Sequence, residues 1–343
     1  MKSVNWRMLL PFAFSALLLV LLINTVRGEA DQLTSALRSA NWLLILPAIG
    51  LYFIGVLTRS ARWGLLLPEH SIKTRTLFAT LVVGFTVNNL LPLRIGEVAR
   101  AYLLARWCSV AVAATVASLV VERVLDGLSL AVLLLLALLM IPSAPPYLWA
   151  VGGFAGAGFL AGAVILALAA WRSSALSAVA EFIARWLPAR ARAGVTGSAN
   201  KFARSLALVH SPLRLVALLA LSLLAWGFEL GLFFVLMFSV GVFGSYPQAL
   251  LVGSAANFAT LLPSSPGYAG TFDAALTKVA QDSLGISAGL AGAYDIIVHA
   301  SLFLPVVLVG TLVLWRSRVT FGQISGARKP AADTQFTAAS SGA

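Results

Sequence analysis

The sequence predicts an all-α polytopic membrane protein with about six full transmembrane helices and two opposed re-entrant helical hairpins in an inverted repeat. Of its 343 residues, 60% are hydrophobic and only 10% are charged, whereas a soluble domain has about 25% charged residues. Most of its apolar runs have the length that spans a bilayer, which is about 20 residues. Two runs, 77–91 and 247–262, are shorter and end at prolines. We therefore expect these two to turn back within the membrane.

Six other apolar runs are predicted to be full spans. They cover residues 8–26, 42–57, 110–140, 149–171, 213–240 and 287–315. The first run is long enough to anchor the chain, so it is not expected to be a cleaved signal peptide. The loop after the second run carries Arg59, Arg62, Lys73 and Arg75. Under the positive-inside rule this loop is cytoplasmic, and the alternation of spans then places both termini in the cytoplasm.

The predicted hairpins cover about 77–106 and 247–277 and resemble each other in sequence. Gly84, Asn88 and Leu91-Pro92 recur as Gly253, Asn257 and Leu262-Pro263. The first hairpin is expected to enter from the cytoplasm and the second from outside, so that their breaks meet near the midplane. Inverted-repeat transporters place their substrate sites in such a position. The alternative is that both segments are ordinary helices kinked by proline.

The rest of the chain shows few features of a soluble domain. Residues 1–318 are expected to form one transmembrane domain, with a basic, amphipathic cytoplasmic segment at 172–212 and a disordered cytoplasmic tail at 319–343. The segment at 172–212 is predicted either as a helix on the inner leaflet or as a solvated loop. The net charge is +12. The basic residues are expected to orient the chain in the membrane and to contact anionic lipid headgroups, and they are not interpreted as a nucleic-acid-binding surface. The single cysteine, Cys108, excludes an internal disulfide and a cysteine-based metal cluster.

The breaks of the two hairpins are the predicted substrate site. A broken helix leaves backbone N–H and C=O groups that lipid cannot satisfy, so the breaks should face protein or a wet cavity. Arg94 lies at the first break, where the returning half-helix directs N–H groups and its positive dipole end inward. An arginine beside a helix N-terminus suits a phosphate. The predicted substrate-binding residues are Arg94, Asn88, Asn89, Gly96, Glu97, Arg100, Ser264, Ser265, Gly267 and Tyr268.

Ionisable residues within the spans are predicted to form an intramembrane charge network. Such groups cost several kcal/mol and usually mark function or a compensating pair. The network is expected to include Glu122, Arg123, Asp126, Glu229, Asp273, Asp295 and His299. Arg123 is expected to meet acids from other helices. Asp295 and His299, four residues apart, could bind a metal, form a satisfied pair or take part in proton coupling; with only two ligands, we predict no metal site.

Three stretches of the sequence resemble a known family. VNNLLP followed by GEVAR, then VERVLD, then LPSSPGYAGTFD are similar to the transmembrane module of bacterial lysylphosphatidylglycerol synthases and its stand-alone, flippase-like relatives. The resemblance covers nearly the whole chain. It implies a multi-pass protein of the bacterial cytoplasmic (inner) membrane that moves a phospholipid or lipid-linked substrate between leaflets. In the synthases a separate soluble domain transfers the amino acid, and no counterpart is expected in the residues after the last span.

We therefore predict a lipid translocase that is not an enzyme and needs no cofactor. Its expected partners are membrane lipids, with a separate lipid-modifying enzyme as a further possibility and no nucleic acid. The alternative is a membrane-embedded subunit or transferase acting on a lipid-linked polyprenyl, hopanoid or aminoacyl-lipid substrate. Against a transferase, the loops carry no Asp-x-Asp motif, nucleophile elbow or catalytic His/Cys pairing.

Overall fold

The described part of the chain consists of helices, most of them joined by short turns. The computed structural model describes residues 6–67, 71–91, 95–171, 211–262, 264–317 and 319, and no strand occurs among them. The helices are α1 (Trp6–Arg27), α2 (Ala30–Ser39), η1 (Trp42–Leu44), α3 (Ile45–Leu66), α4 (Thr74–Leu90), α5 (Gly96–Cys108), α6 (Val112–Met140), α7 (Pro146–Trp171), α10 (Pro212–Ser239), α11 (Tyr246–Ala259), η4 (Pro266–Tyr268), α12 (Thr271–Leu284) and α13 (Ala288–Ser317). The predicted segments at 172–212 and 319–343 fall almost wholly outside the described residues.

Five of the described helices are long and apolar enough to cross a membrane. These spans are Trp42–Leu66, Val112–Met140, Pro146–Leu168, Leu213–Ser239 and Ala288–Ser317. They coincide with five of the six predicted spans. The predicted span at 8–26 coincides with α1, which bends by 87° into α2; together these two helices would make a sixth span. The prediction of an all-α polytopic membrane protein is confirmed.

The second span is longer than its apolar run indicated. We predicted a span over 42–57 with Arg59 and Arg62 in a cytoplasmic loop, but α3 continues to Leu66. Arg59 and Arg62 lie inside this helix and are only 4% and 0% exposed. The prediction was wrong because the two arginines were read as ending the span. Each of them finds a carboxylate inside the bundle, so the helix can continue past both charges.

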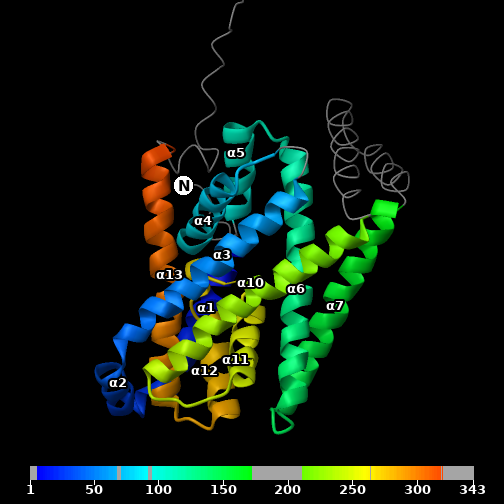
Figure 1. Cartoon of the computed structure of the whole chain (residues 1–343). Coiled ribbons are helices and arrows are strands. Elements are labelled where there is room, and N and C mark those ends of the chain that lie inside the picture. Colours follow the sequence, from blue (N-terminus) through cyan, green and yellow to red (C-terminus); the bar gives the residue numbers. More distant parts are fainter. Residues whose placement is uncertain are drawn as a thin grey trace, which may run out of the picture.

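Helices α4, α5, α11 and α12 form two pairs of short helices at opposite ends of the molecule (Figure 1). Helix α4 packs on α5, and α11 packs on α12. The first pair lies at the end where α6 begins and α13 ends; the second lies at the end where α6 ends and α13 begins. With 17, 13, 14 and 14 residues, they are about 20–26 Å long at about 1.5 Å per residue, shorter than a hydrocarbon core of about 30 Å. Re-entry of the pairs from opposite membrane faces stays a prediction.

The outer surface of the bundle is apolar, as contact with lipid requires. The side chains of Phe154 and Ile165 on α7 are 81% and 64% exposed, and those of Leu308 and Trp315 on α13 are 69% and 76% exposed. In the interior, α3 packs along α10, and α6 packs on α7, α10 and α11. A helix that is apolar on its outer side as well as its inner side is typical of a membrane span. The polar side chains described below therefore lie inside an apolar shell.

The orientation of the bundle in the membrane stays a prediction that cysteine labelling can test. Ser71 lies in the α3–α4 connection, whereas Ser143 and Ser245 lie in the turns after α6 and α10; all three are exposed. After removal of Cys108, a cysteine at Ser71 is expected to react only with membrane-permeant thiol reagents in intact cells. Cysteines at Ser143 and Ser245 are expected to react with impermeant reagents. The reverse pattern would invert the predicted topology, including both short-helix pairs.

Candidate functional site

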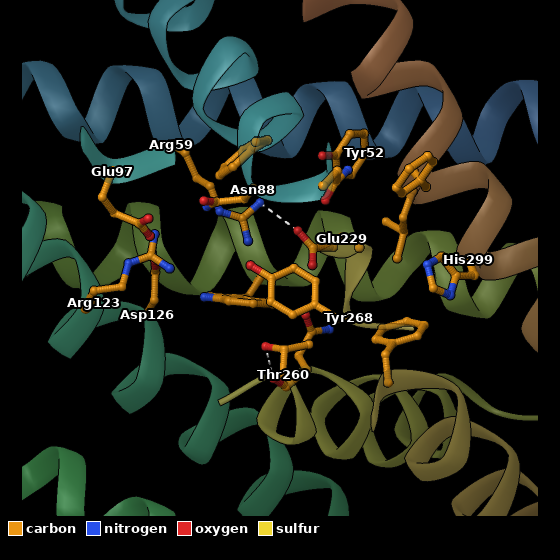
Figure 2. A pocket seen from close by; sticks show the side chains of 18 of the residues that line it. Tyr52, Arg59, Asn88, Glu97, Arg123, Asp126, Glu229, Thr260, Tyr268 and His299 are labelled. Atoms are coloured by element: carbon orange, nitrogen blue, oxygen red, sulfur yellow. Dashed lines mark hydrogen bonds and ion pairs between the residues drawn. The ribbon is translucent and has the colours of Figure 1, made fainter. Parts of the chain in front are cut away.

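A polar cavity lies where the turns of the two short-helix pairs meet the long helices. The cavity has a volume of about 180 Å³. Its η4 wall packs on α4, and a Cβ added to Gly267 would lie 3.6 Å from the Asn89 carbonyl oxygen. The charged or titratable side chains that line it are Arg59, Glu97, Arg100, Arg123, Asp126, Glu229 and His299. Figure 2 shows Glu229 and Tyr268 near its middle, with Arg123 and Glu97 at one side and His299 at the other.

Two buried arginines from other helices neutralise the acids of α6. Both terminal nitrogens of Arg100 donate to the two carboxylate oxygens of Glu122, each at 2.7 Å. Arg62 Nη1 donates to Asp126 Oδ1 at 2.5 Å and to Ser222 Oγ at 2.8 Å. The side chains of Arg62 and Arg100 are 0% and 2% exposed. The Arg100–Glu122 contact is two-pronged, whereas Arg62 uses Nη1 alone. Together the two contacts remove four charges from water while keeping each one paired.

Aromatic rings support this charge cluster. The Arg100 guanidinium lies 4.0 Å from the centroid of the Trp63 ring, and the Trp63 Nε1–H donates to Ser118 Oγ at 2.9 Å. A cation held over an indole face is attracted by the negative face of the ring, most strongly when water is excluded. Trp63 is fully buried. Arg100 is therefore held on one side by Glu122 and on another by Trp63.

A second ion pair borders the cavity between α3 and α10. Arg59 Nη1 lies 2.8 Å from Glu229 Oε2, with side chains 5% and 10% exposed. The Arg59 guanidinium also lies 4.6 Å from the centroid of the Trp226 ring. Glu229 was predicted to belong to the charge network, and its partner is the arginine that we had placed in a loop.

Arg123 is the arginine of the cluster that remains most accessible. Its side chain is 41% exposed, and its Nη2 lies 2.9 Å from Glu122 Oε1 and 3.4 Å from Asp126 Oδ2. Both of these acids are on its own helix. The expectation that Arg123 meets acids from other helices therefore does not hold for its ion pairs, but Glu97 of α5 does lie beside it. Arg100 and Arg62 lie closer to Glu122 and Asp126, at 2.7 and 2.5 Å, than Arg123 does. Figure 2 shows Arg123 beside Glu97, whose Oε2 is buried without a hydrogen-bond partner.

The turns of the two pairs use some of the N–H groups that we had assigned to a phosphate. The Gly96 N–H donates to Asn88 Oδ1 at 2.7 Å, and the Ser265 N–H donates to Ser15 Oγ at 2.8 Å. Of the predicted substrate residues, those lining the cavity are Asn88, Asn89, Glu97, Arg100, Gly267 and Tyr268. Gly96, Ser264 and Ser265 are not part of its lining. Arg94 falls outside the described residues, so its predicted role stays a prediction.

The repeated glycine and asparagine occupy equivalent places in α4 and α11 but make different contacts. Asn88 and Asn257 each lie two residues before the end of their helix. Asn88 caps α5 through Gly96, whereas the Asn257 amide donates back to the Gly253 carbonyl at 2.9 Å. The start of α12 is instead capped by Asp273, which accepts from the Gly270 N–H at 2.6 Å. The sequence repeat therefore marks equivalent positions, not equivalent hydrogen bonds.

Asp273, Asp295 and His299 form a separate group between α12 and α13. His299 Nδ1 lies 2.5 Å from Asp273 Oδ1, so the partner of His299 is an aspartate on another helix. Asp295 is 5% exposed, and its Oδ1 has no hydrogen-bond partner. One ligand atom from each of the three residues lies within 4.8 Å of those of the others. His299 also lines the polar cavity.

Sequence reasoning missed several cavity residues, including Arg59, Tyr52, Trp226, Asn257 and Thr260. One signal was available for the arginines of α3. The predicted spans contained more acids than bases, and Arg59 and Arg62, spaced three apart, continue the helical pattern of the preceding run. For Asn257 the internal repeat was a signal, because it matches Asn88 of the first hairpin. Tyr52, Trp226 and Thr260 carried no comparable signal, because aromatic and hydroxyl side chains are frequent in membrane helices.

Comparison with known proteins gives one match that covers most of the chain. Residues 8–310 match the family model described as lysylphosphatidylglycerol synthase TM region. A UPF0104 membrane protein from Methanothermobacter thermautotrophicus is 33% identical over 99 residues, which is 28% of this chain and 29% of that protein. The chain thus matches less than a third of the length of this relative. No solved structure matches it.

Proposed function

The chain belongs to the lysylphosphatidylglycerol synthase TM region family, and from this premise we propose that it is a lipid translocase. It would move the polar headgroup of a phospholipid or lipid-linked substrate through the central cavity while the acyl chains stay in the membrane. The observation that carries the proposal is the charged cavity inside an apolar shell, at the point where two short-helix pairs from opposite ends of the molecule meet. Ionisable groups at such a place are costly and therefore usually functional.

The cavity suits a headgroup that carries phosphate. Arg123 is 41% exposed and holds its own-helix acids at 2.9 and 3.4 Å, so it can exchange one of these contacts for a phosphate oxygen. Its guanidinium offers two parallel donors that match phosphate geometry. Arg62 and Arg100 cannot do the same without abandoning buried carboxylates. Neighbouring carboxylates, Glu97 and Glu229, would face the positive or hydroxyl part of the headgroup.

Translocation is favoured over chemistry at this site. Most of the charged side chains among the described residues that line the cavity are held in ion pairs, such as Arg59 with Glu229 and Arg123 with Asp126. We propose that the protein acts in the bacterial inner membrane with both termini in the cytoplasm, and that any lipid-modifying step belongs to a separate enzyme.

Replacing Arg123 by glutamine is expected to lower lipid transfer by about ten- to a hundredfold, because one charge-assisted hydrogen bond to phosphate contributes about 1.5–3 kcal/mol. Arg123→Lys keeps the charge without the planar fork and should fall between wild type and Arg123→Gln. The measurement is the movement of labelled phospholipid between leaflets in proteoliposomes. Lys278→Gln is the matched control, since Lys278 is 66% exposed, pairs with Asp282 and does not line the cavity.

Two results would contradict these expectations in different ways. If wild-type proteoliposomes move no tested lipid faster than protein-free liposomes, the proposed translocase activity is overturned. If the wild type is active and folded Arg123→Gln matches it, the phosphate is not held at Arg123. Arg94→Ala would then be the next variant to compare, on the sequence-based expectation for that residue.

A further inference from the structure

Asp273, Asp295 and His299 form a group of their own and take no part in the arginine–carboxylate ion pairs described above. Asp273 lies in the first turn of α12, and Asp295 and His299 lie one turn apart on α13. Asp273 Oδ2 accepts from the Gly270 N–H, and Asp273 Oδ1 contacts His299 Nδ1 at 2.5 Å. Asp295 is 5% exposed, its Oδ1 has no hydrogen-bond partner, and one of its two carboxylate oxygens lies within 4.8 Å of ligand atoms of Asp273 and His299.

His299 lies between two different cavities. On one side is the polar cavity proposed for the headgroup. On the other is a larger cavity of about 590 Å³ beneath α1 and α2, whose walls are mainly apolar side chains such as Leu19, Leu22 and Ile296. Of these two cavities, Asp273 and Asp295 border the second and not the first. The two aspartates are thus remote from bulk water, and His299 connects them to the polar side.

The remaining titratable groups of the surrounding helices do not neutralise this cluster. Most are engaged elsewhere: Glu29 with the Gly289 N–H, Glu229 with Arg59, Tyr294 with the Phe233 carbonyl, and Lys278 with Asp282. Arg27 lines the second cavity, and Tyr52 and Tyr268 bring neutral hydroxyls to the first. Two ionised aspartates beside a neutral imidazole would therefore leave a double negative charge in an apolar setting, at a cost of several kcal/mol per ion.

A proton fits this cluster better than a metal ion does. A zinc ion bound at about 2.0–2.2 Å by oxygen and nitrogen ligands needs those ligand atoms farther apart than the Asp273–His299 contact of 2.5 Å. That contact instead places a hydrogen bond, and so one proton, between the imidazole and the carboxylate. A second proton on Asp295 would remove the other negative charge and give its unpaired oxygen an O–H bond.

We propose that Asp273, Asp295 and His299 form a proton-binding site whose loading favours entry of an anionic headgroup into the polar cavity. This inference rests on the proposed translocase function. A proton from water in the polar cavity binds His299 and passes to an aspartate, where an O–H bond forms as the N–H bond breaks. The wall of the cavity becomes less negative, so a phosphate is repelled less. Loss of the proton restores the negative charge and favours release of the phosphate.

The first experiment tests the site without relying on transport. Infrared difference spectra of the purified protein between near-neutral and alkaline pH, a range in which exposed carboxyl groups stay ionised, should show the C=O stretch of a carboxylic acid that is still protonated near neutral pH. We expect Asp295→Asn to remove most of this signal, whereas Asp282→Asn should keep it, because Asp282 pairs with Lys278 outside the cluster. His299→Gln should shift its pH dependence. An unchanged signal in folded Asp295→Asn overturns the proposal, as does a divalent metal bound one per chain that Asp295→Asn loses.

The second experiment links the site to lipid movement. A gradient of one pH unit across the proteoliposome membrane should change the wild-type transfer rate by up to about tenfold, the ratio of the proton concentrations. Asp295→Asn is expected to lose this response whatever its rate without a gradient, and Asp282→Asn should respond as wild type does. A gradient response that survives in Asp295→Asn overturns the coupling. If wild type moves no lipid at all, the proposed function fails, and the infrared result still decides whether the proton site exists.

Discussion

Replacing Arg62 by alanine is expected to cost about 3–5 kcal/mol of folding free energy, enough to lower the yield of folded protein sharply. Arg62 is fully buried and reaches Asp126 at 2.5 Å, Ser222 at 2.8 Å and Glu122 at 4.0 Å. Among the described residues, its loss leaves Asp126 with an ion pair to Arg123, whose Nη2 lies 3.4 Å away and whose side chain is 41% exposed. The measurement is the thermal midpoint and folded fraction of the purified protein in detergent at a fixed heating rate.

Two further variants separate an ion-pair effect from a general loss of packing. Arg38→Ala removes an exposed arginine of α2 and should change the midpoint little. The double variant Arg62→Met with Asp126→Leu should recover part of the loss, because replacing both members of a buried pair with apolar residues is often nearly neutral. If Arg62→Ala melts like Arg38→Ala, Arg62 is not required to neutralise the acids of α6.

The comparison between Arg62 and Arg123 shows what the sequence could and could not predict. The presence of a charge network around Glu122 and Asp126 followed from the cost of acids inside a span. Their partners did not follow, because the arginines lie at positions 62 and 100, on helices distant in the chain. Arg123 was the obvious partner by proximity in sequence. In the structure it is the outermost of the three arginines and the one best placed to contact a ligand.

The fold shows the same division between local and long-range information. Apolar run lengths and breaks at Pro92 and Pro263 were sufficient to predict long spans and short paired helices. These features located five spans and α1 correctly but ended the α3 span too early. The length of an apolar run does not show whether an arginine beyond it is neutralised by an acid from a helix distant in the sequence. The contact between Ser15 of α1 and Ser265 of the second turn likewise has no sequence signal.

Gly96→Ala is expected to separate α4 from α5 and to abolish most lipid transfer. A Cβ on Gly96 would lie only 2.1 Å from the Gly84 carbonyl oxygen and 2.5 Å from Asn88 Oδ1. Backbone at such a contact cannot move aside as a flexible side chain could, so one helix must shift. Overpacking of this kind costs about 1–3 kcal/mol, and losing the Asn88 cap adds about 1 kcal/mol. The shift would also displace Glu97 and Arg100, which follow Gly96 on α5 and line the cavity.

The matched control for this variant is Gly153→Ala in α7, where an added Cβ meets nothing within 4 Å. This substitution should leave transfer unchanged and stabilise the helix by about 0.5–1 kcal/mol, because alanine loses less backbone freedom than glycine. The two variants add the same methyl group, so the difference between their thermal midpoints and transfer rates reports the α4–α5 contact alone. If Gly96→Ala melts and transports like Gly153→Ala, the close approach of the two helices is not needed, and the cavity wall does not depend on it.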